Sequence, residues 1–167
     1  MSHTMSDLWH RPASLPLLLL FGSGGALLGA LFFQYIVGLA PCELCYDQRY
    51  AHVAVLVPAA LSLFLSGLFR QLLLGVAGLA LLASAGLAGY HIGVEQGWWA
   101  SGCSAPAFDN LDIGQLRAAL EATPVVRCDE VPWSFLGISM AGYNFLLSLG
   151  LAVVTLGSVG GRFWRSA

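Results

Sequence analysis

Four cysteines are the residues of this 167-residue chain whose type and spacing point to chemistry. Two of them form a Cys-x-x-Cys pair, Cys42 and Cys45, and the other two, Cys103 and Cys128, share one long segment between apolar runs. A dithiol that cycles between reduced and oxidised forms needs a thiolate, which a helix N-terminus or a nearby cation favours. The sequence therefore predicts redox chemistry at the cysteines.

Other uses of these cysteines need features that the sequence matches poorly. A c-type haem site requires histidine directly after the second cysteine, but Tyr46 stands there. A four-cysteine zinc site usually combines two close-spaced pairs, and Cys103 and Cys128 are not close-spaced, so no metal site is predicted. A structural disulfide remains open for Cys103 and Cys128. It is less favoured for Cys42 and Cys45, because their two-residue gap closes a small, reactive ring.

Arg49 is the cation nearest to the close pair in the sequence. If a helix begins near Cys45, Arg49 lies one turn further along the same face, where its guanidinium can stand beside the Cys45 sulfur. The alternative, an arginine that only anchors a helix end at the membrane boundary, stays open from position alone.

A dithiol that is oxidised to a disulfide in a membrane protein must pass two electrons to an acceptor. The sequence contains no visible haem, flavin or iron–sulfur motif, which leaves a lipid-soluble two-electron carrier, a quinone, as the simplest acceptor. An arginine at the bilayer edge suits a quinone carbonyl, because its fixed charge stabilises an oxygen that becomes anionic.

The composition indicates that lipid surrounds most of the chain. Hydrophobic residues make up 57% and charged residues 10%, whereas soluble domains usually carry about a quarter charged residues. Four apolar runs are long enough to cross roughly 30 Å of hydrocarbon: 15–39, 50–69, 72–90 and 140–159. We expect an all-α membrane protein, a single domain over 1–167, with four transmembrane helices in one bundle and loops at 40–49 and 92–139.

Lysine is absent and the arginines are scattered, which argues against a nucleic-acid partner.

The arginines also predict an orientation. Four of them, Arg11, Arg70, Arg162 and Arg165, flank the ends on the side of the termini, against Arg49 and Arg127 on the other. By the positive-inside rule, both termini are cytoplasmic. The cysteines then face an extracytoplasmic compartment, where disulfides persist.

The long loop contains one helical pattern, with Asp112 as N-cap and Pro124 as stop. Its apolar residues Ile113, Leu116 and Leu120 share one face, which predicts a short helix on the membrane surface. A helix that packs on the loop's own residues is the alternative. Tryptophans near span ends are expected to anchor the chain at the interface; they are Trp98, Trp99 and Trp133.

Taken together, these motifs resemble the bacterial disulfide bond formation protein B (DsbB) family. The resemblance rests on Pro41-Cys42-Glu43-Leu44-Cys45 followed by Asp47-Gln48-Arg49-Tyr50, on a long second loop with two cysteines, and on Trp133-Ser134-Phe135-Leu136-Gly137 before the last span. It extends over nearly the whole chain from Leu15 to Gly157.

The resemblance implies an inner-membrane protein-disulfide oxidase. Cys103 and Cys128 would form the disulfide that oxidises a periplasmic, thioredoxin-like DsbA-type partner, and Cys42 and Cys45 the disulfide next to ubiquinone or menaquinone. Arg49 then matches the family's quinone-contacting arginine.

His91 is a second candidate for the quinone carbonyl. His91 and Glu95 are one turn apart near the end of the third span, and ionisable residues at membrane depth carry a functional presumption. They could relay protons to the reduced quinone, or they could simply be solvated at the interface.

Two other functions remain open. A reductase of the vitamin K epoxide reductase type also combines helices, cysteine pairs and quinones, but its Cys-x-x-Cys lies inside a late helix. A non-enzymatic membrane scaffold would use its cysteines as permanent structural disulfides.

Overall fold

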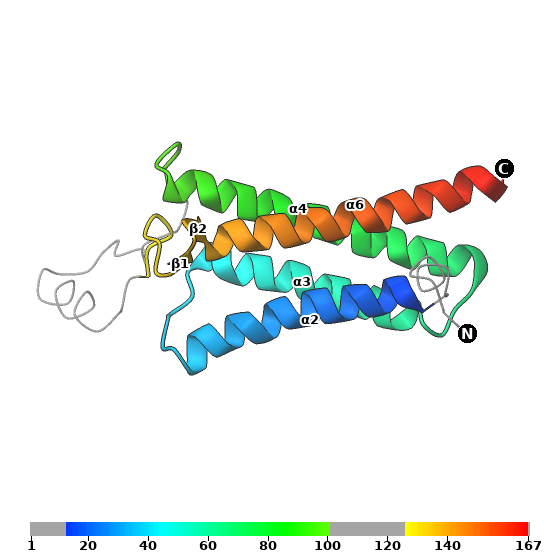
Figure 1. The fold of residues 1–167 in the computed structure, drawn as a ribbon, viewed down its shortest axis with the longest axis horizontal. Coiled ribbons are helices and arrows are strands. Elements are labelled where there is room, and N and C mark those ends of the chain that lie inside the picture. The colour runs from blue at the N-terminus through cyan, green and yellow to red at the C-terminus, as the bar shows by residue number, and fades with distance from the viewer. Residues whose placement is uncertain (1–12, 101–125, 167) are drawn as a thin grey trace, which may run out of the picture.

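The computed structural model describes residues 13–100 and 126–166, which form a bundle of four long helices capped at one end by a small hairpin (Figure 1). The helices are α2 (Ser14–Tyr35), α3 (Glu43–Leu61), α4 (Gly67–Glu95) and α6 (Met140–Ser166). Helix α4 packs most extensively against α6 and α3, and α2 packs on α3 but little on α6. The start of α2 and the end of α6 lie at one end of the bundle, and the hairpin lies at the other.

Three helices are long and apolar enough to cross a membrane: Ser14–Tyr35, Gly67–Glu95 and the Met140–Gly161 part of α6. Helix α3 is not among them, because its first two turns carry Glu43, Asp47 and Arg49. Length and composition therefore support three of the four predicted spans, and α3 completes the bundle as a helix with a polar beginning.

The second and third helices differ in extent from the apolar runs. Helix α3 starts at Glu43, inside the predicted loop 40–49, because Cys42 serves as its N-cap. The turn between α3 and α4 falls inside the predicted run 50–69. That turn is itself apolar, with Leu63, Phe64 and Leu65, so hydropathy does not reveal it; the Ser62 hydroxyl closes the end of α3 by donating to Ala59 O at 2.7 Å.

A two-stranded antiparallel hairpin precedes α6. Strands β1 (Ser134–Phe135) and β2 (Ile138–Ser139) pair across Leu136 and Gly137. Both turn residues have positive φ, 51° and 76°, as a two-residue turn of type I′ requires. Leu136 adopts this left-handed conformation although it is not glycine, which marks the turn as a strained position.

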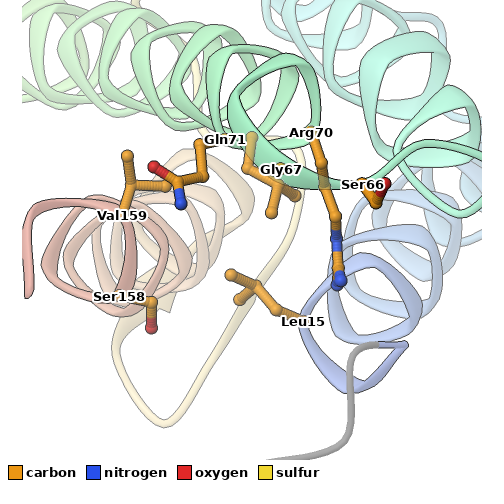
Figure 2. A pocket seen from close by; sticks show the side chains of 8 residues that line it. Leu15, Ser66, Gly67, Arg70, Gln71, Ser158 and Val159 are labelled. Carbon is orange, nitrogen blue, oxygen red and sulfur yellow. The ribbon is translucent and has the colours of Figure 1, made fainter. Parts of the chain in front are cut away.

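The apolar core fills the half of the bundle near the termini. Buried Leu19, Val55, Ala59 and Leu81 are among its members, and Gly78 allows close packing, since a Cβ there would lie 2.6 Å from the Leu156 side chain of α6. A small cavity of about 100 Å³ lies beyond this core, beside Arg70 and the α3–α4 turn (Figure 2). The other half of the bundle is polar inside and contains Cys42, Cys45 and Cys128.

Candidate active site

The close cysteine pair lies at the N-terminus of α3. Cys42 is the N-cap residue, and its sulfur accepts a hydrogen bond from the Cys45 backbone N–H at 3.3 Å. Both cysteines are free thiols, and their sulfurs lie 2.8 Å apart. Because a helix N-terminus favours negative charge, this position suits a dithiol that must ionise before it reacts.

The two thiols do not share the proton equally. Their mutual hydrogen bond is the main cause: it lowers the pKa of the Cys45 thiol to about 7 and raises the pKa of Cys42 above its usual range. Burial opposes the ionisation of Cys45, whereas the positive charge of Arg49 supports it. Cys45 is therefore the thiol of the reduced pair that ionises more readily, and Cys42 is the hydrogen-bond donor when it does.

Cys128 reaches this pair from the far end of the long loop. It is fully buried, disulfide-bonded, and packed with Cys42 and Val94 in one small cluster. Leu44 and Cys45 border the same cluster. The structure thus places Cys128, one cysteine of the predicted Cys103–Cys128 pair, in contact with the Cys42–Cys45 pair. Cys103, and the predicted surface helix from Asp112 to Pro124, lie outside the described residues.

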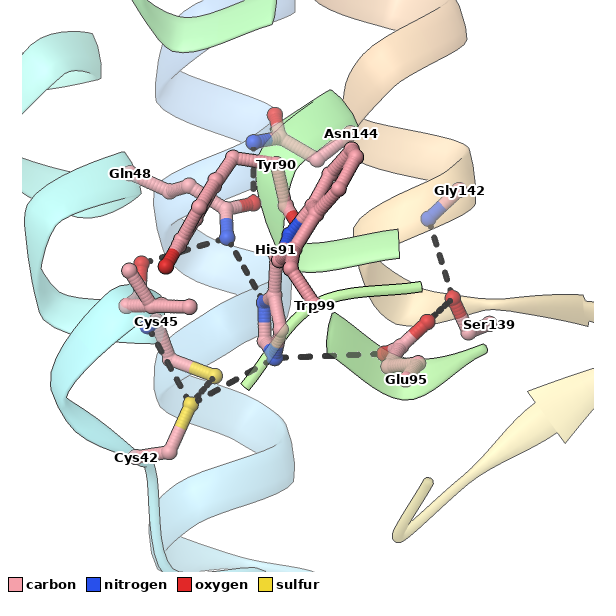
Figure 3. Close-up of polar contacts among 11 residues, drawn as sticks. Cys42, Cys45, Gln48, Tyr90, His91, Glu95, Trp99, Ser139, Gly142 and Asn144 are labelled. Atoms are coloured by element: carbon pink, nitrogen blue, oxygen red, sulfur yellow. Dashed lines mark hydrogen bonds and ion pairs between the residues drawn. The ribbon is translucent and has the colours of Figure 1, made fainter. Parts of the chain in front are cut away.

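His91 and Glu95 of α4 lie beside the thiols (Figure 3). His91 Nε2 is 3.7 Å from Cys42 Sγ and 3.9 Å from Glu95 Oε1. Both side chains are at most 5% exposed. Glu95 also accepts a hydrogen bond from the Ser139 hydroxyl at 2.6 Å. These two residues are thus buried within the protein, and His91 contacts the thiol pair directly.

A chain of hydrogen bonds runs from this site into the bundle. Gln48 Nε2 donates to Leu44 O at 3.1 Å and lies 2.9 Å from His91 Nδ1. Asn144 Nδ2 donates to Gln48 Oε1 at 2.6 Å, and Asn144 Oδ1 lies 2.7 Å from His52 Nε2. Residues from α3, α4 and α6 therefore meet in one buried polar layer.

The backbone carbonyl of Leu44 sets the direction of every bond in this polar chain. A carbonyl can only accept, so the Gln48 atom facing it is the amide nitrogen. The same nitrogen donates to His91 Nδ1, which leaves the hydrogen of a neutral His91 ring on Nε2, toward Cys42. On the other side, Gln48 Oε1 accepts from Asn144, and Asn144 Oδ1 then accepts from His52 Nε2.

The hydrogen bonds of His91 indicate whether this histidine and the two thiols hold a metal ion. Cys42, Cys45 and His91 offer ligand atoms within 4.8 Å of one another. A ligating histidine, however, normally donates its second ring N–H to an acceptor, and Gln48 presents a donor to His91 Nδ1. The network therefore favours a thiol pair with a hydrogen-bonding histidine over a metal centre.

An apolar cavity of about 660 Å³ opens beside Cys45, within the usual range of about 300–1,000 Å³ for ligand sites. All four helices and the hairpin contribute to it. Its polar lining consists of few residues: Arg49, Gln48, His52, His91, Glu95, Tyr143 and Asn144. A flat, mostly apolar ring with a few polar atoms fits such a lining.

Arg49 joins α3 to α2 at the edge of this cavity. Its guanidinium donates to Gln34 Oε1 and, at 3.2 Å, to the Ala30 carbonyl, and it lies 5.3 Å from the centre of the Tyr46 ring. A guanidinium has five N–H donors, so it retains donors for a ligand. The sequence prediction that Arg49 lies near Cys45 agrees with its effect on the Cys45 pKa.

Trp133 belongs to the aromatic part of the cavity wall. Its ring centroid lies 4.9 Å from that of Phe33 on α2 and 6.3 Å from that of Phe135 in the hairpin. It also lies 6.2 Å from the ring of Tyr143 on α6. The sequence predicts Trp133 as an interfacial anchor rather than as a residue that stacks on a cofactor. The structure places it in the cavity wall, because the hairpin turns the chain back over the bundle.

Comparisons with known proteins agree with this arrangement. The family model "Disulfide bond formation protein DsbB" matches residues 12–157. The chain belongs to the DsbB family. Curated relatives named disulfide bond formation protein B include those of Polaromonas naphthalenivorans, 30% identical over 90% of this chain and 93% of the relative, and of Methylococcus capsulatus, 34% identical over 78% and 83%. No solved structure gives a significant match.

Membership of the DsbB family, together with three membrane-capable helices, identifies a multi-pass membrane protein that acts in disulfide bond formation. The predicted site residues Cys45, Arg49 and His91 line one cavity, and Cys42 lies directly behind them, against Cys45 and His91. Sequence reasoning missed the inward-facing polar residues Gln48, His52 and Asn144. The sequence could have revealed them, because each is a polar residue within or beside an apolar run. A polar side chain buried there without a hydrogen-bond partner is costly, so a partner should have been expected.

Proposed function

We propose that this DsbB-family protein is a protein-disulfide oxidase of the bacterial inner membrane that reoxidises a periplasmic DsbA-like thiol oxidoreductase and passes the electrons to a membrane quinone. Both termini would be cytoplasmic and the cysteines periplasmic. The observation that carries the proposal is the position of Cys45: its sulfur lies 2.8 Å from that of Cys42, and it lines a large apolar cavity whose polar lining includes Arg49.

The first step is exchange with the soluble partner. The partner's dithiol reduces the Cys103–Cys128 disulfide, so that two electrons and two protons move to this chain and the partner leaves oxidised. Burial of Cys128 against Cys42 supports a second exchange, in which the new dithiol reduces the Cys42–Cys45 disulfide. Each exchange breaks one disulfide and forms another, so electrons and protons balance.

The second step reoxidises the Cys42–Cys45 dithiol at the cavity. A quinone, ubiquinone or menaquinone, accepts two electrons and two protons when bound there. Cys45 lines the cavity and carries the thiolate, while His91 donates toward Cys42, the thiol that must lose its proton as the disulfide forms. Arg49 offers fixed positive charge to a ring oxygen. The rings of Trp133 and Phe33 pack against each other and form part of the apolar wall around the bound ring.

The alternatives fit less well. In the vitamin K epoxide reductase type, the Cys-x-x-Cys lies inside a late helix, whereas here Cys42 caps the second long helix of the bundle. A scaffold held by permanent disulfides would not need free thiols at Cys42 and Cys45 beside a ligand-sized cavity.

Anaerobic mixing of the purified chain, a reduced DsbA-like protein and a ubiquinone analogue tests the proposal. Quinone absorbance should fall in proportion to the partner disulfide formed, at one quinone for each disulfide. A chain that oxidises the partner without consuming quinone, or that leaves the partner reduced, contradicts the proposal.

A further inference from the structure

Glu95 of α4 is a carboxylate that the fold buries beside the thiol pair. Its side chain is 4% exposed. The Ser139 hydroxyl donates to it at 2.6 Å and in turn accepts from the Gly142 backbone N–H at 3.1 Å (Figure 3). Burying a carboxylate is costly, and an ionisable residue at membrane depth is a candidate for a functional role.

The basic residue beside Glu95 does not neutralise its charge. Among the described residues, His91 is the only basic one within ion-pair distance of the carboxylate, at 3.9 Å. The hydrogen bond that Gln48 donates to His91 Nδ1 matches a neutral ring, because a protonated ring is a donor at both nitrogens. The negative charge of Glu95 therefore acts on the groups around it.

The thiols lie within reach of this charge. Glu95 Oε1 is 3.9 Å from His91 Nε2, which is 3.7 Å from Cys42 Sγ. Both steps together stay within a Debye length of about 8–10 Å, and buried charges are screened less than exposed ones. The largest influences on the pKa of the Cys45 thiol are its hydrogen bond with Cys42 and burial. Of the two charged residues that follow, Arg49 lowers this pKa and Glu95 raises it.

A charge that disfavours the thiolate also changes the redox equilibrium of the pair. A disulfide is a stronger oxidant when its reduced form is stabilised, and a more stable thiolate is one way to stabilise that form. A negative charge beside the pair has the opposite effect. It destabilises the reduced form and makes the dithiol a better electron donor.

We propose that Glu95 lowers the reduction potential of the Cys42–Cys45 pair, so that the dithiol gives up its two electrons and two protons more readily to the acceptor in the cavity. Glu95 acts through its charge and takes part in no bond exchange. The benefit to the acceptor rests on the proposed quinone function, whereas the effect on the pair can be measured without a quinone.

Two substitutions test the charge. Glu95→Gln removes it and keeps an oxygen that can accept from Ser139. Glu43→Gln is the matched control, because Glu43 is an exposed carboxylate in the first turn of α3, where water and salt screen its charge. The full chain is equilibrated anaerobically in detergent with glutathione buffers and no quinone. Differential alkylation and peptide mass spectrometry then give the fraction of Cys42 and Cys45 in the disulfide.

Above the Cys45 pKa of about 7, Glu95→Gln should shift the equilibrium toward the dithiol by about three- to thirtyfold, as expected for one unit charge at effective dielectric constants of about 20–60. A tenfold shift corresponds to about 30 mV. Glu43→Gln should shift the equilibrium by less than about twofold. Well below this pKa, where both thiols are protonated in either chain, the difference between wild type and Glu95→Gln should disappear.

An unchanged equilibrium in Glu95→Gln, or a shift of the same size at low and high pH, overturns the proposal, because a change in packing alone would not depend on thiol ionisation. If Glu95→Gln does not fold, Glu95→Met removes the same charge with a side chain of similar length and decides by the same criterion. A wild-type chain that shows the shift relative to the variant but reduces no quinone keeps the role of Glu95 at the thiol pair and refutes the proposed quinone function.

Discussion

The Nε2 atom of His91 lies 3.7 Å from the sulfur of Cys42, and this contact joins the thiol pair to the polar interior of the bundle. Gln48 donates to the opposite ring nitrogen of His91 at 2.9 Å, so the hydrogen of the neutral ring lies on Nε2. This nitrogen faces the Cys42 sulfur and, at 3.9 Å, Glu95 Oε1, and His91 also makes a hydrogen bond with the backbone of Cys128. Cys42, the thiol of the reduced pair that keeps its proton more readily, therefore accepts a hydrogen bond from His91 in addition to the one from the Cys45 backbone N–H. In the proposed reaction, a hydrogen-bond donor at this position would stabilise Cys42 as it loses its own proton.

Replacing Cys45 by serine should abolish quinone reduction while preserving one exchange with the partner. The reason is that Cys103 and Cys128 remain able to form a disulfide, but no disulfide can form beside the cavity. Single-turnover mixing with the reduced partner, followed by thiol counting, should give one oxidised partner for each chain. Continued quinone turnover in Cys45→Ser would show that the close pair does not face the quinone.

Replacing Cys128 by serine should trap the complex with the partner. The Cys103 thiolate would then attack the disulfide of the oxidised partner and release one partner thiol. Because no Cys128 thiol is present to resolve the mixed disulfide, this adduct should accumulate. Non-reducing gels followed by mass spectrometry identify the cysteine in the adduct. An adduct through Cys42 or Cys45, or no adduct at all, would contradict the assigned order of exchange.

Alkylation of Cys45 in the reduced chain should depend on pH with a midpoint near the Cys45 pKa of about 7. Only the thiolate reacts with iodoacetamide, so the rate should be low below the midpoint and should rise as the pH increases through it. Peptide mass spectrometry measures the reaction at Cys45 alone.

Cys42→Ala is the matched variant for this measurement. It removes the hydrogen bond between the sulfurs, which is the main cause of the lowered pKa, and the midpoint should move upward. An identical midpoint in both chains would assign the low pKa of Cys45 to Arg49 or to the helix N-terminus instead.

The mutual placement of the close cysteine pair and Arg49 could be predicted from the sequence because it depends on short spacings; their redox roles stay a prediction. Cys42, Cys45 and Arg49 lie within two turns of one helix, so their mutual placement follows once that helix is assumed. The positions of the spans follow from hydropathy in the same local way. The apolar turn between α3 and α4 is the exception, because its residues are as hydrophobic as the helices beside it.

The polar layer could not be predicted, because its members are far apart in the chain. Asn144 contacts Gln48 and His52 from another helix, and only the packing of α6 against the bundle determines that these residues meet. The hairpin was missed for a different reason. Its turn uses Leu136 in a left-handed conformation, which the residue type itself disfavours.

Arg49→Ala should raise the apparent Michaelis constant for quinone far more than that for the partner. A charge-assisted hydrogen bond contributes about 1.5–3 kcal/mol, which corresponds to roughly a 10- to 150-fold change in affinity. Lysine should restore only part of the loss, because it lacks the planar fork of the guanidinium. Steady-state kinetics with each substrate varied in turn gives both constants.

Gln34→Ala is the control for Arg49, since it removes the acceptor on α2 and keeps the guanidinium. It should change the quinone constant much less than Arg49→Ala. If both variants behave alike, or if Arg49→Ala only lowers the amount of folded protein in the membrane, Arg49 serves as a tether between α2 and α3. The ring oxygen would then need another donor, and His91 is the next candidate.

Gln48 and Asn144 should be energetically coupled, because each satisfies the other inside the bundle. Gln48→Met alone leaves Asn144 Nδ2 without its closest acceptor, and Asn144→Leu alone leaves Gln48 Oε1 without its donor; a buried group stranded in this way costs about 1–3 kcal/mol. The double variant removes both groups. Its loss of stability should therefore be smaller than the sum of the single losses, by about 0.5–3 kcal/mol as expected for directly contacting residues. Denaturant unfolding in detergent micelles measures the four chains of this cycle, and additive losses would mean that the two amides do not depend on each other.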